Sequence, residues 1–153
     1  MQKYLIKPKN QKIWYIPVPS CDAKVAKKVI SQLNLMKKSN TAAIFVGINT
    51  GRKDSIVQAD IIGYHLHKKS ADLGVPLVTH AEDSSLGASF HLLMQGQTVL
   101  ADKATFIGNI GFRATPWMLK EFVKKNEINI KYVHHGENKV RFNKFQDLKD
   151  QDV

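Results

Sequence analysis

Three serines lie where an α/β enzyme often carries its nucleophile. Ser84, Ser85 and Ser89 follow a short apolar segment at residues 77–79 and lead into an apolar stretch that ends near Met94. A strand, a turn and a buried helix present the residue at the turn to a substrate, and a serine there attacks a carbonyl when a neighbouring base takes its proton. These hydroxyls are therefore the candidate nucleophiles of the chain.

Metal chemistry is the second possibility that the residue types raise. The chain has six histidines: His65, His67, His80, His91, His134 and His135. None of them forms the His-x-x-x-His spacing that places two metal ligands on one helix face, and the single cysteine excludes a Cys-x-x-Cys pair. We expect no metal and no cofactor, and we interpret His80 and His91 as polar contacts beside the loop between them.

The stretch at residues 76–111 resembles peptidase family S49, the signal peptide peptidase A and SohB proteins. The family pattern is Lys-Pro-Val, a strand, Ala-Ser-Gly-Gly-Tyr-Tyr, a helix, Ala-Asp, and Thr-Gly-Ser-Ile-Gly-Val. Matching positions without a gap are Pro76, Phe90-His91, Ala101-Asp102 and Gly108-Asn109-Ile110-Gly111. The resemblance covers residues 13–139. It implies a shortened ClpP/crotonase-like α/β domain, with a mainly parallel sheet flanked by helices.

The same resemblance implies a degenerate catalytic site. Gly87, which has no side chain, falls at the position of the family's nucleophilic serine. The catalytic lysine of the family follows a strand in a Gly-x-x-Lys setting, which Lys139 matches 52 positions after Gly87. Asn109 replaces a family serine close to that lysine. We therefore expect that the lysine is kept, that the serine is lost and that no residue is catalytic.

The loop that helps to bind the oxyanion is also altered. In the family it reads Asn-Ser-Pro-Gly-Gly, and its glycine amides stabilise the tetrahedral oxyanion. This chain matches the start of the loop with Asn49 and Thr50 and then carries Gly51, Arg52 and Lys53. A phosphate-binding loop does not fit either, because no Gly-Lys-Ser or Gly-Lys-Thr follows. The resemblance thus implies that a second part of the site is lost.

A substitute nucleophile requires one of the three serines to face Lys139. Ser89 lies two positions beyond Gly87, and two helical residues turn a side chain by roughly 200°, away from the original direction. We expect Ser84 and Ser85 to bind amides of the loop. Without a serine partner, Lys139 is expected to be a surface lysine.

Alternating strands and helices are expected to position these residues. Apolar runs predict strands at residues 13–16, 42–48, 77–79 and 128–133, and two short strands before Gly111. Pro17 should end the first strand. Helices are predicted from Ser20 or Asp22 to about residue 40, from Ser55 to a left-handed cap at Gly74, and over residues 115–125.

Three regions are expected: a basic arm at residues 1–12, the S49-like domain at 13–138 and a polar tail at 139–153. The 23 basic and 13 acidic residues give a net charge of +10, which suits RNA, anionic lipid or acidic protein surfaces. No window approaches eighteen apolar residues, so we expect no membrane span. The single cysteine fits a reducing compartment. A basic start without acidic residues before Asp22 favours the mitochondrial matrix, with the cytoplasm as the alternative.

Three functions remain open at this point. The resemblance favours a non-catalytic S49-like protein that acts as a structural or assembly subunit of a larger mitochondrial complex. Its partners would be protein subunits, including further copies of the chain. One alternative is an active serine-lysine peptidase with an unrecognised nucleophile. The other is an RNA-facing, ribosome-associated protein, which the charge alone supports.

Overall fold

A computed structural model describes residues 11–50, 54–111, 117–136, 139 and 143–146. The chain divides into two compact units, Met1–Gly111 and Phe112–Val153. Among the described residues, the first unit contains the sheet and three helices, and the second contains one short helix. The expected boundaries after residues 12 and 138 stay predictions.

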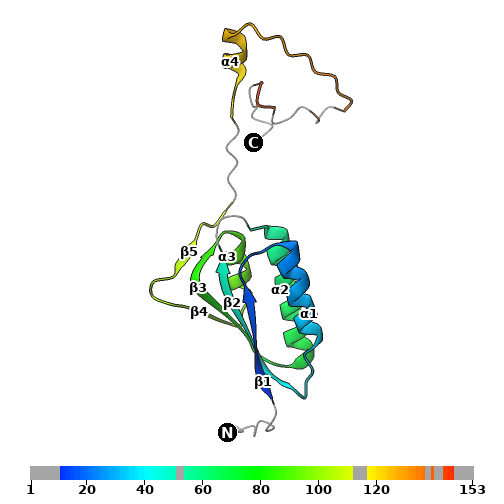
Figure 1. Ribbon diagram of the computed structural model, residues 1–153, viewed down its shortest axis with the longest axis vertical. Coiled ribbons are helices and arrows are strands. Elements are labelled where there is room, and N and C mark those ends of the chain that lie inside the picture. The colour runs from blue at the N-terminus through cyan, green and yellow to red at the C-terminus, as the bar shows by residue number, and fades with distance from the viewer. Residues whose placement is uncertain (1–10, 51–53, 112–116, 137–138, 140–142, 147–153) are drawn as a thin grey trace. The chain divides into compact units, whose positions relative to one another are not determined.

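The first unit is built on a parallel sheet (Figure 1). Its described strands are β1 (Lys12–Val18), β2 (Thr41–Thr50), β3 (Leu77–Leu86), β4 (Thr98–Ala101) and β5 (Phe106–Gly108). They lie in the order β1-β2-β3-β4, while β5 pairs with the second half of β3, and every pair is parallel. The predicted α/β fold with a mainly parallel sheet and flanking helices is confirmed.

The two long helices begin and end at residues that the sequence indicates. The Asp22 carboxylate accepts the amides of Lys24 and Val25 at the start of α1 (Ala23–Asn34). Ser55 caps α2 (Ile56–Leu73), and Gly74 ends it with φ 64° and ψ 38°. α1 ends at Asn34 rather than near residue 40, and Asn40 accepts the Lys37 amide at 2.8 Å in a separate turn.

The hydrophobic core lies between one face of the sheet and the helices α1, α2 and α3 (Ala88–Leu93). Alternate strand residues point into it, which is the two-residue period of a strand. The strands contribute Ile16, Val18, Ile44, Val46, Ile48, Leu77 and Ala81, and the helices contribute Ala26, Val29, Leu33, Ala59, Ile62, Leu66, Leu92 and Leu93. The residues between them on the strands face the opposite side of the sheet.

Two expectations about the strands are wrong. The segment expected as a polar loop after residue 79 continues β3 as far as Leu86, since Thr50 pairs with Ser85 on one side and β5 pairs on the other. Hydrogen bonding from two neighbours overrides the low strand propensity of Asp83 and Ser84. Likewise β1 continues through Pro17 to Val18. An edge strand tolerates a residue without an N–H group.

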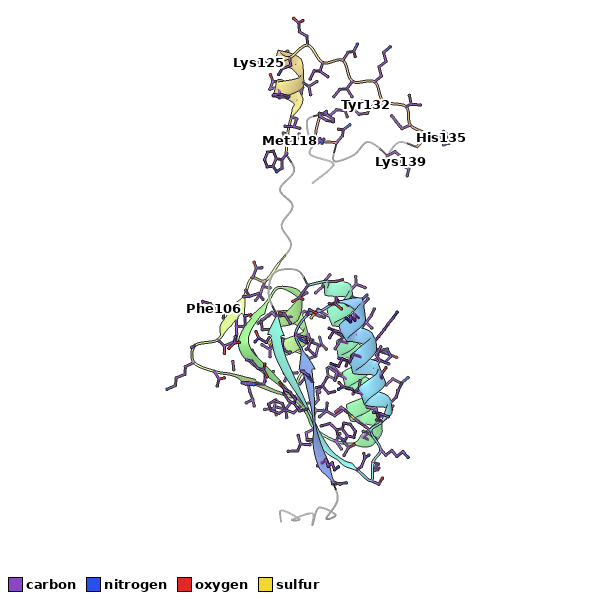
Figure 2. All side chains as sticks on the ribbon, viewed as in Figure 1. Phe106, Met118, Lys125, Tyr132, His135 and Lys139 are labelled. Atoms are coloured by element: carbon purple, nitrogen blue, oxygen red, sulfur yellow. The ribbon has the colours of Figure 1, made fainter. Side chains whose placement is uncertain are left out.

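The second unit is less regular than expected. Its helix α4 spans Lys120–Lys125, while the expected start at Thr115 and Pro116 lies outside the described residues. The strand predicted at residues 128–133 is wrong: these residues have no strand partner in the described part of the chain. Strand propensity alone does not form a strand without a neighbour. Val133 is 101% exposed, and Met118 and Tyr132 are also exposed (Figure 2).

Within residues 11–50, 54–111 and 117–136, every helix is too short or too polar to span a bilayer.

Cys21 is fully buried where β1 leads into α1, and its amide donates to Asp54 Oδ1 at 2.7 Å. Burial raises the pKa of its thiol to about 12, and the carboxylates of Asp54 and Asp22 add to the effect. Because only a thiolate attacks a disulfide reagent, we expect no reaction of the native protein with Ellman's reagent near neutral pH. One equivalent should react in guanidinium chloride. Fast labelling of the folded chain would contradict this burial.

Candidate functional site

Gly87 forms the turn between the end of β3 and the start of α3. Its backbone has φ 64° and ψ −115°, a conformation that glycine adopts far more easily than residues with a Cβ. Its N–H donates to the Gly108 carbonyl at 2.9 Å, and its own carbonyl accepts the His91 N–H at 3.2 Å. The turn is therefore held from both β5 and α3.

The space beside Gly87 is open, with Asn109 next to it. A Cβ atom at Gly87 would lie 3.8 Å from both the Nδ2 and the carbonyl oxygen of Asn109, an ordinary van der Waals contact. Asn109 itself has a positive φ of 54°. The structure thus brings together two predicted site residues, Gly87 and Asn109. Their equivalence to the two family serines stays a prediction.

The three candidate serines do not offer exposed hydroxyls. Ser84 Oγ donates to the Thr50 carbonyl at 2.9 Å, and Ser89 Oγ donates to the Leu86 carbonyl at 3.1 Å. Ser85 is fully buried on β3, and its Oγ has no hydrogen-bond partner among the described residues. The expectation that Ser84 and Ser85 bind loop amides is wrong, because both belong to a strand.

Lys139 belongs to the second unit and is exposed. Its amide donates to the Gly136 carbonyl at 3.3 Å. The side chain borders an open surface hollow of about 380 Å³, together with Tyr132, Val133, His134 and His135. Its pairing with a site at Gly87 stays a prediction that the family resemblance makes.

The altered oxyanion loop falls largely outside the described residues, which exclude Gly51, Arg52 and Lys53. Its two ends are described. Before the loop, Asn49 Nδ2 donates to Asp83 Oδ2 at 2.6 Å. After the loop, Asp54 accepts the amide of Cys21. These contacts hold both ends of the loop against neighbouring segments.

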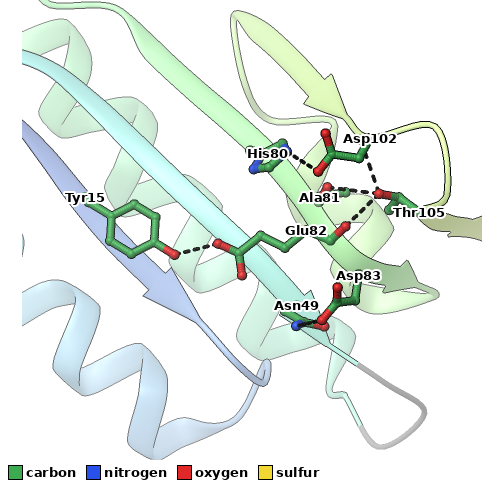
Figure 3. Close-up of polar contacts among 8 residues, drawn as sticks. All are labelled: Tyr15, Asn49, His80, Ala81, Glu82, Asp83, Asp102 and Thr105. Carbon is green, nitrogen blue, oxygen red and sulfur yellow. Dashed lines mark hydrogen bonds and ion pairs between the residues drawn. The ribbon is translucent and has the colours of Figure 1, made fainter.

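The two histidines singled out by sequence each pair with a carboxylate. His91 Nε2 lies 3.3 Å from Asp60 Oδ1 on α2, and His80 Nε2 lies 3.4 Å from Asp102 Oδ2 (Figure 3). In the part of the chain that is described, no three such side chains gather as a metal site would require. The interpretation of His80 and His91 as polar contacts agrees with these pairs.

Sequence reasoning missed a hydrogen bond that crosses the sheet. The Tyr15 hydroxyl on β1 donates to Glu82 Oε1 on β3 at 2.5 Å, across the intervening strand β2 (Figure 3). Gly47 of β2 leaves the necessary space, since a Cβ there would lie 2.5 Å from both oxygens. A glycine inside an apolar central strand signals such a close approach, although it does not identify the partners.

Replacing Gly47 by alanine is expected to break this hydrogen bond and to destabilise the unit by about 1–3 kcal/mol, the usual cost of overpacking. The hydrogen bond to Glu82, then burial and the Glu82 charge, raise the pKa of Tyr15. The contribution of Tyr15 to the free energy of unfolding is therefore fully present below the pKa of an unfolded tyrosine. It is lost as the pH rises through the pKa of Tyr15 in the folded chain.

Urea unfolding and the absorbance of tyrosinate measure both effects. The pKa of Tyr15 should fall towards its ordinary value in Gly47→Ala, and Tyr15→Phe should remove the alkaline loss of stability without crowding. An unchanged tyrosine titration in Gly47→Ala would show that the bond across β2 is absent.

A parallel sheet with helices on one face, and a strand-to-helix turn at the candidate site, define an α/β protein of the ClpP/crotonase type. The model of peptidase family S49 matches residues 69–152, which is more than half of the chain. The chain belongs to peptidase family S49. The matched region contains Gly87, Asn109 and Lys139. No match was found among curated proteins.

Proposed function

We propose that this chain is a non-catalytic S49 protein that serves as a structural or assembly subunit of a larger complex in the mitochondrion. The observation that carries the proposal is Gly87, a residue without a side chain at the turn between β3 and α3. That turn is where the family resemblance expects the nucleophilic serine.

Peptide hydrolysis by a serine and a lysine requires three coincident parts. A hydroxyl must attack, a neutral lysine must take its proton, and amides must stabilise the oxyanion. Gly87 lacks the hydroxyl, and Ser84 and Ser89 donate theirs to backbone carbonyls. The altered loop at Arg52 and Lys53 argues against the amides that would stabilise the oxyanion. These features favour a protein that has lost the chemistry.

The fold does not depend on the missing hydroxyl. The turn at Gly87 is held by backbone hydrogen bonds to Gly108 and His91, and the core under it is closed by Leu92 and Leu93. A fold that persists after its site is lost is available for structural work, because function resides in sites grafted on folds.

The mitochondrial location rests on the basic start of the chain. Lys3, Lys7, Lys9 and Lys12 precede the first acidic residue, Asp22. Fractionation of cells that express the tagged chain tests this part separately, and recovery in the cytosol alone would remove it.

Turnover of casein and of short peptides tests the loss of activity. We expect the purified chain to hydrolyse neither above the blank. Lys139→Ala should behave the same, with a free energy of unfolding within about 0.5 kcal/mol of the parent, as for other exposed positions. Hydrolysis by the parent that disappears in Lys139→Ala would replace this proposal with that of an active serine-lysine peptidase.

A further inference from the structure

Within residues 11–50 and 54–111, no helix or strand covers one face of the parallel sheet. The helices α1, α2 and α3 all pack on the other face (Figure 1). Parallel sheets are almost always buried on both faces. We call the uncovered side the open sheet face and define it by Tyr15, Phe45, His80, Glu82, Leu100 and Asp102.

The middle of the open sheet face is apolar and aromatic. The Tyr15 and Phe45 rings lie 6.0 Å apart, and the Phe45 and His80 rings lie 5.9 Å apart, so the row crosses three strands. Tyr15 is 51% exposed on β1, and Leu100 is exposed on β4, the strand next to β3. Such a row matches the inner layer of an α/β sandwich rather than a solvated surface.

Carboxylates accompany this apolar row. Glu82 holds the Tyr15 hydroxyl, and Asp102 lies beside His80 with its side chain 75% exposed (Figure 3). Residues 13–18, 41–50, 77–86 and 98–101, which form β1 to β4 apart from Lys12 at the start of β1, contain no lysine or arginine. The face is therefore locally acidic, although the chain as a whole carries a net charge of +10.

The outer side of α1 has the complementary character. Lys24, Lys28 and Leu35 are exposed at spacings of four and seven residues, which places them on one stripe of the helix and its cap. Leu35 is 64% exposed, and α1 contains no acidic residue. A helix that offers one apolar side chain and a line of lysines suits an aromatic sheet face that bears carboxylates.

We propose that the open sheet face of one copy of the chain binds the outer stripe of α1 from a second copy. Leu35 would contact the aromatic row, while Lys24 and Lys28 would pair with Glu82 and Asp102. The helix then supplies the layer that the parallel sheet lacks. The net charge of +10 does not prevent this contact, because physiological salt screens charges beyond about 8 Å.

The contact is head-to-tail, since it joins two different surfaces of the same chain. This contact would be one form of the proposed assembly role, and it rests on that role only because it names a second copy of the chain as the partner. A chain that associates and also hydrolyses peptides would keep the inference and remove the proposed function. A monomeric chain without peptidase activity would keep the proposed function and overturn this contact.

Sedimentation equilibrium of the full chain at micromolar concentrations tests the proposal. We expect reversible association that weakens as salt increases. Glu82→Lys with Asp102→Lys, and separately Lys24→Glu with Lys28→Glu, should each raise the Kd of self-association by about tenfold to a hundredfold, because like charges then face each other. Mixing the two double variants should restore association as a heterodimer, since each keeps the partner surface that the other lacks.

Two further variants keep the test decisive. Lys68→Glu with Lys69→Glu makes the same change in net charge on α2 and should leave the Kd within about twofold, because these lysines lie off the α1 stripe. Glu82→Gln with Asp102→Asn removes the charges while preserving shape, and should weaken association even if the lysine substitutions disturb folding. A monomeric parent chain, an equal effect of the α2 pair, or no recovery on mixing the folded variants would overturn the proposal.

Discussion

Gly87→Ser is expected to remain inactive as a peptidase, although it supplies the hydroxyl that the turn lacks. The loop at Gly51, Arg52 and Lys53 does not carry the paired glycines of the family, and the loss of one oxyanion donor reduces the rate by about 10²- to 10³-fold. A serine at φ 64° and ψ −115° also carries backbone strain of about 1–3 kcal/mol. Restoring one group therefore does not restore the reaction.

The matching experiment compares this single variant with a triple variant that also contains Arg52→Gly and Lys53→Gly. Activity on casein or a short peptide should appear, if at all, only in the triple variant, with both proteins checked for folding by circular dichroism. Robust turnover by Gly87→Ser alone would show that the oxyanion site is intact despite the altered loop.

The second large effect is expected in the core. Ile62 is 0% exposed on the side of α2 that packs against the sheet, so Ile62→Ala should lower the free energy of unfolding by about 2–5 kcal/mol. Val57 belongs to the same helix but is 62% exposed, and Val57→Ala should change it by less than about 0.5 kcal/mol. Urea unfolding followed by circular dichroism compares the two. Equal losses would contradict the assignment of this helix face to the core.

Local patterns were sufficient to predict the helical layer and the central strand. In α2, apolar residues at helical spacing lie between Ser55 and Gly74, and each of these three signals has a direct physical cause. The second half of β3 was not predictable in this way. Asp83, Ser84 and Ser85 favour loops, and they form a strand only because β2 and β5 lie on either side. Residues 128–133 show the converse, because their strand-forming side chains have no partner strand in the described part of the chain.

The residues of the candidate site also differ in whether the sequence alone could identify them. Gly87 and Asn109 could be singled out from the sequence because both lie in short motifs that the family resemblance aligns without a gap, and their roles stay predictions. The Tyr15–Glu82 hydrogen bond joins residues 67 positions apart and depends on the register of three strands. The pairing of His80 with Asp102 depends in the same way on β3 and β4. Side chains alone do not specify such registers before the sheet is known.

Labelling with a fluorophosphonate probe, followed by intact-mass spectrometry, shows whether the chain carries an activated serine. The probe attaches covalently to an activated serine, so an active S49 peptidase treated in parallel should gain one adduct and provide the control for probe access. We predict that the native chain gains none, because Gly87 has no hydroxyl, Ser85 and Ser89 are fully buried, and Ser84 donates its hydroxyl to the Thr50 carbonyl. One stoichiometric adduct on the native chain, lost in Lys139→Ala, would instead identify an active serine-lysine peptidase.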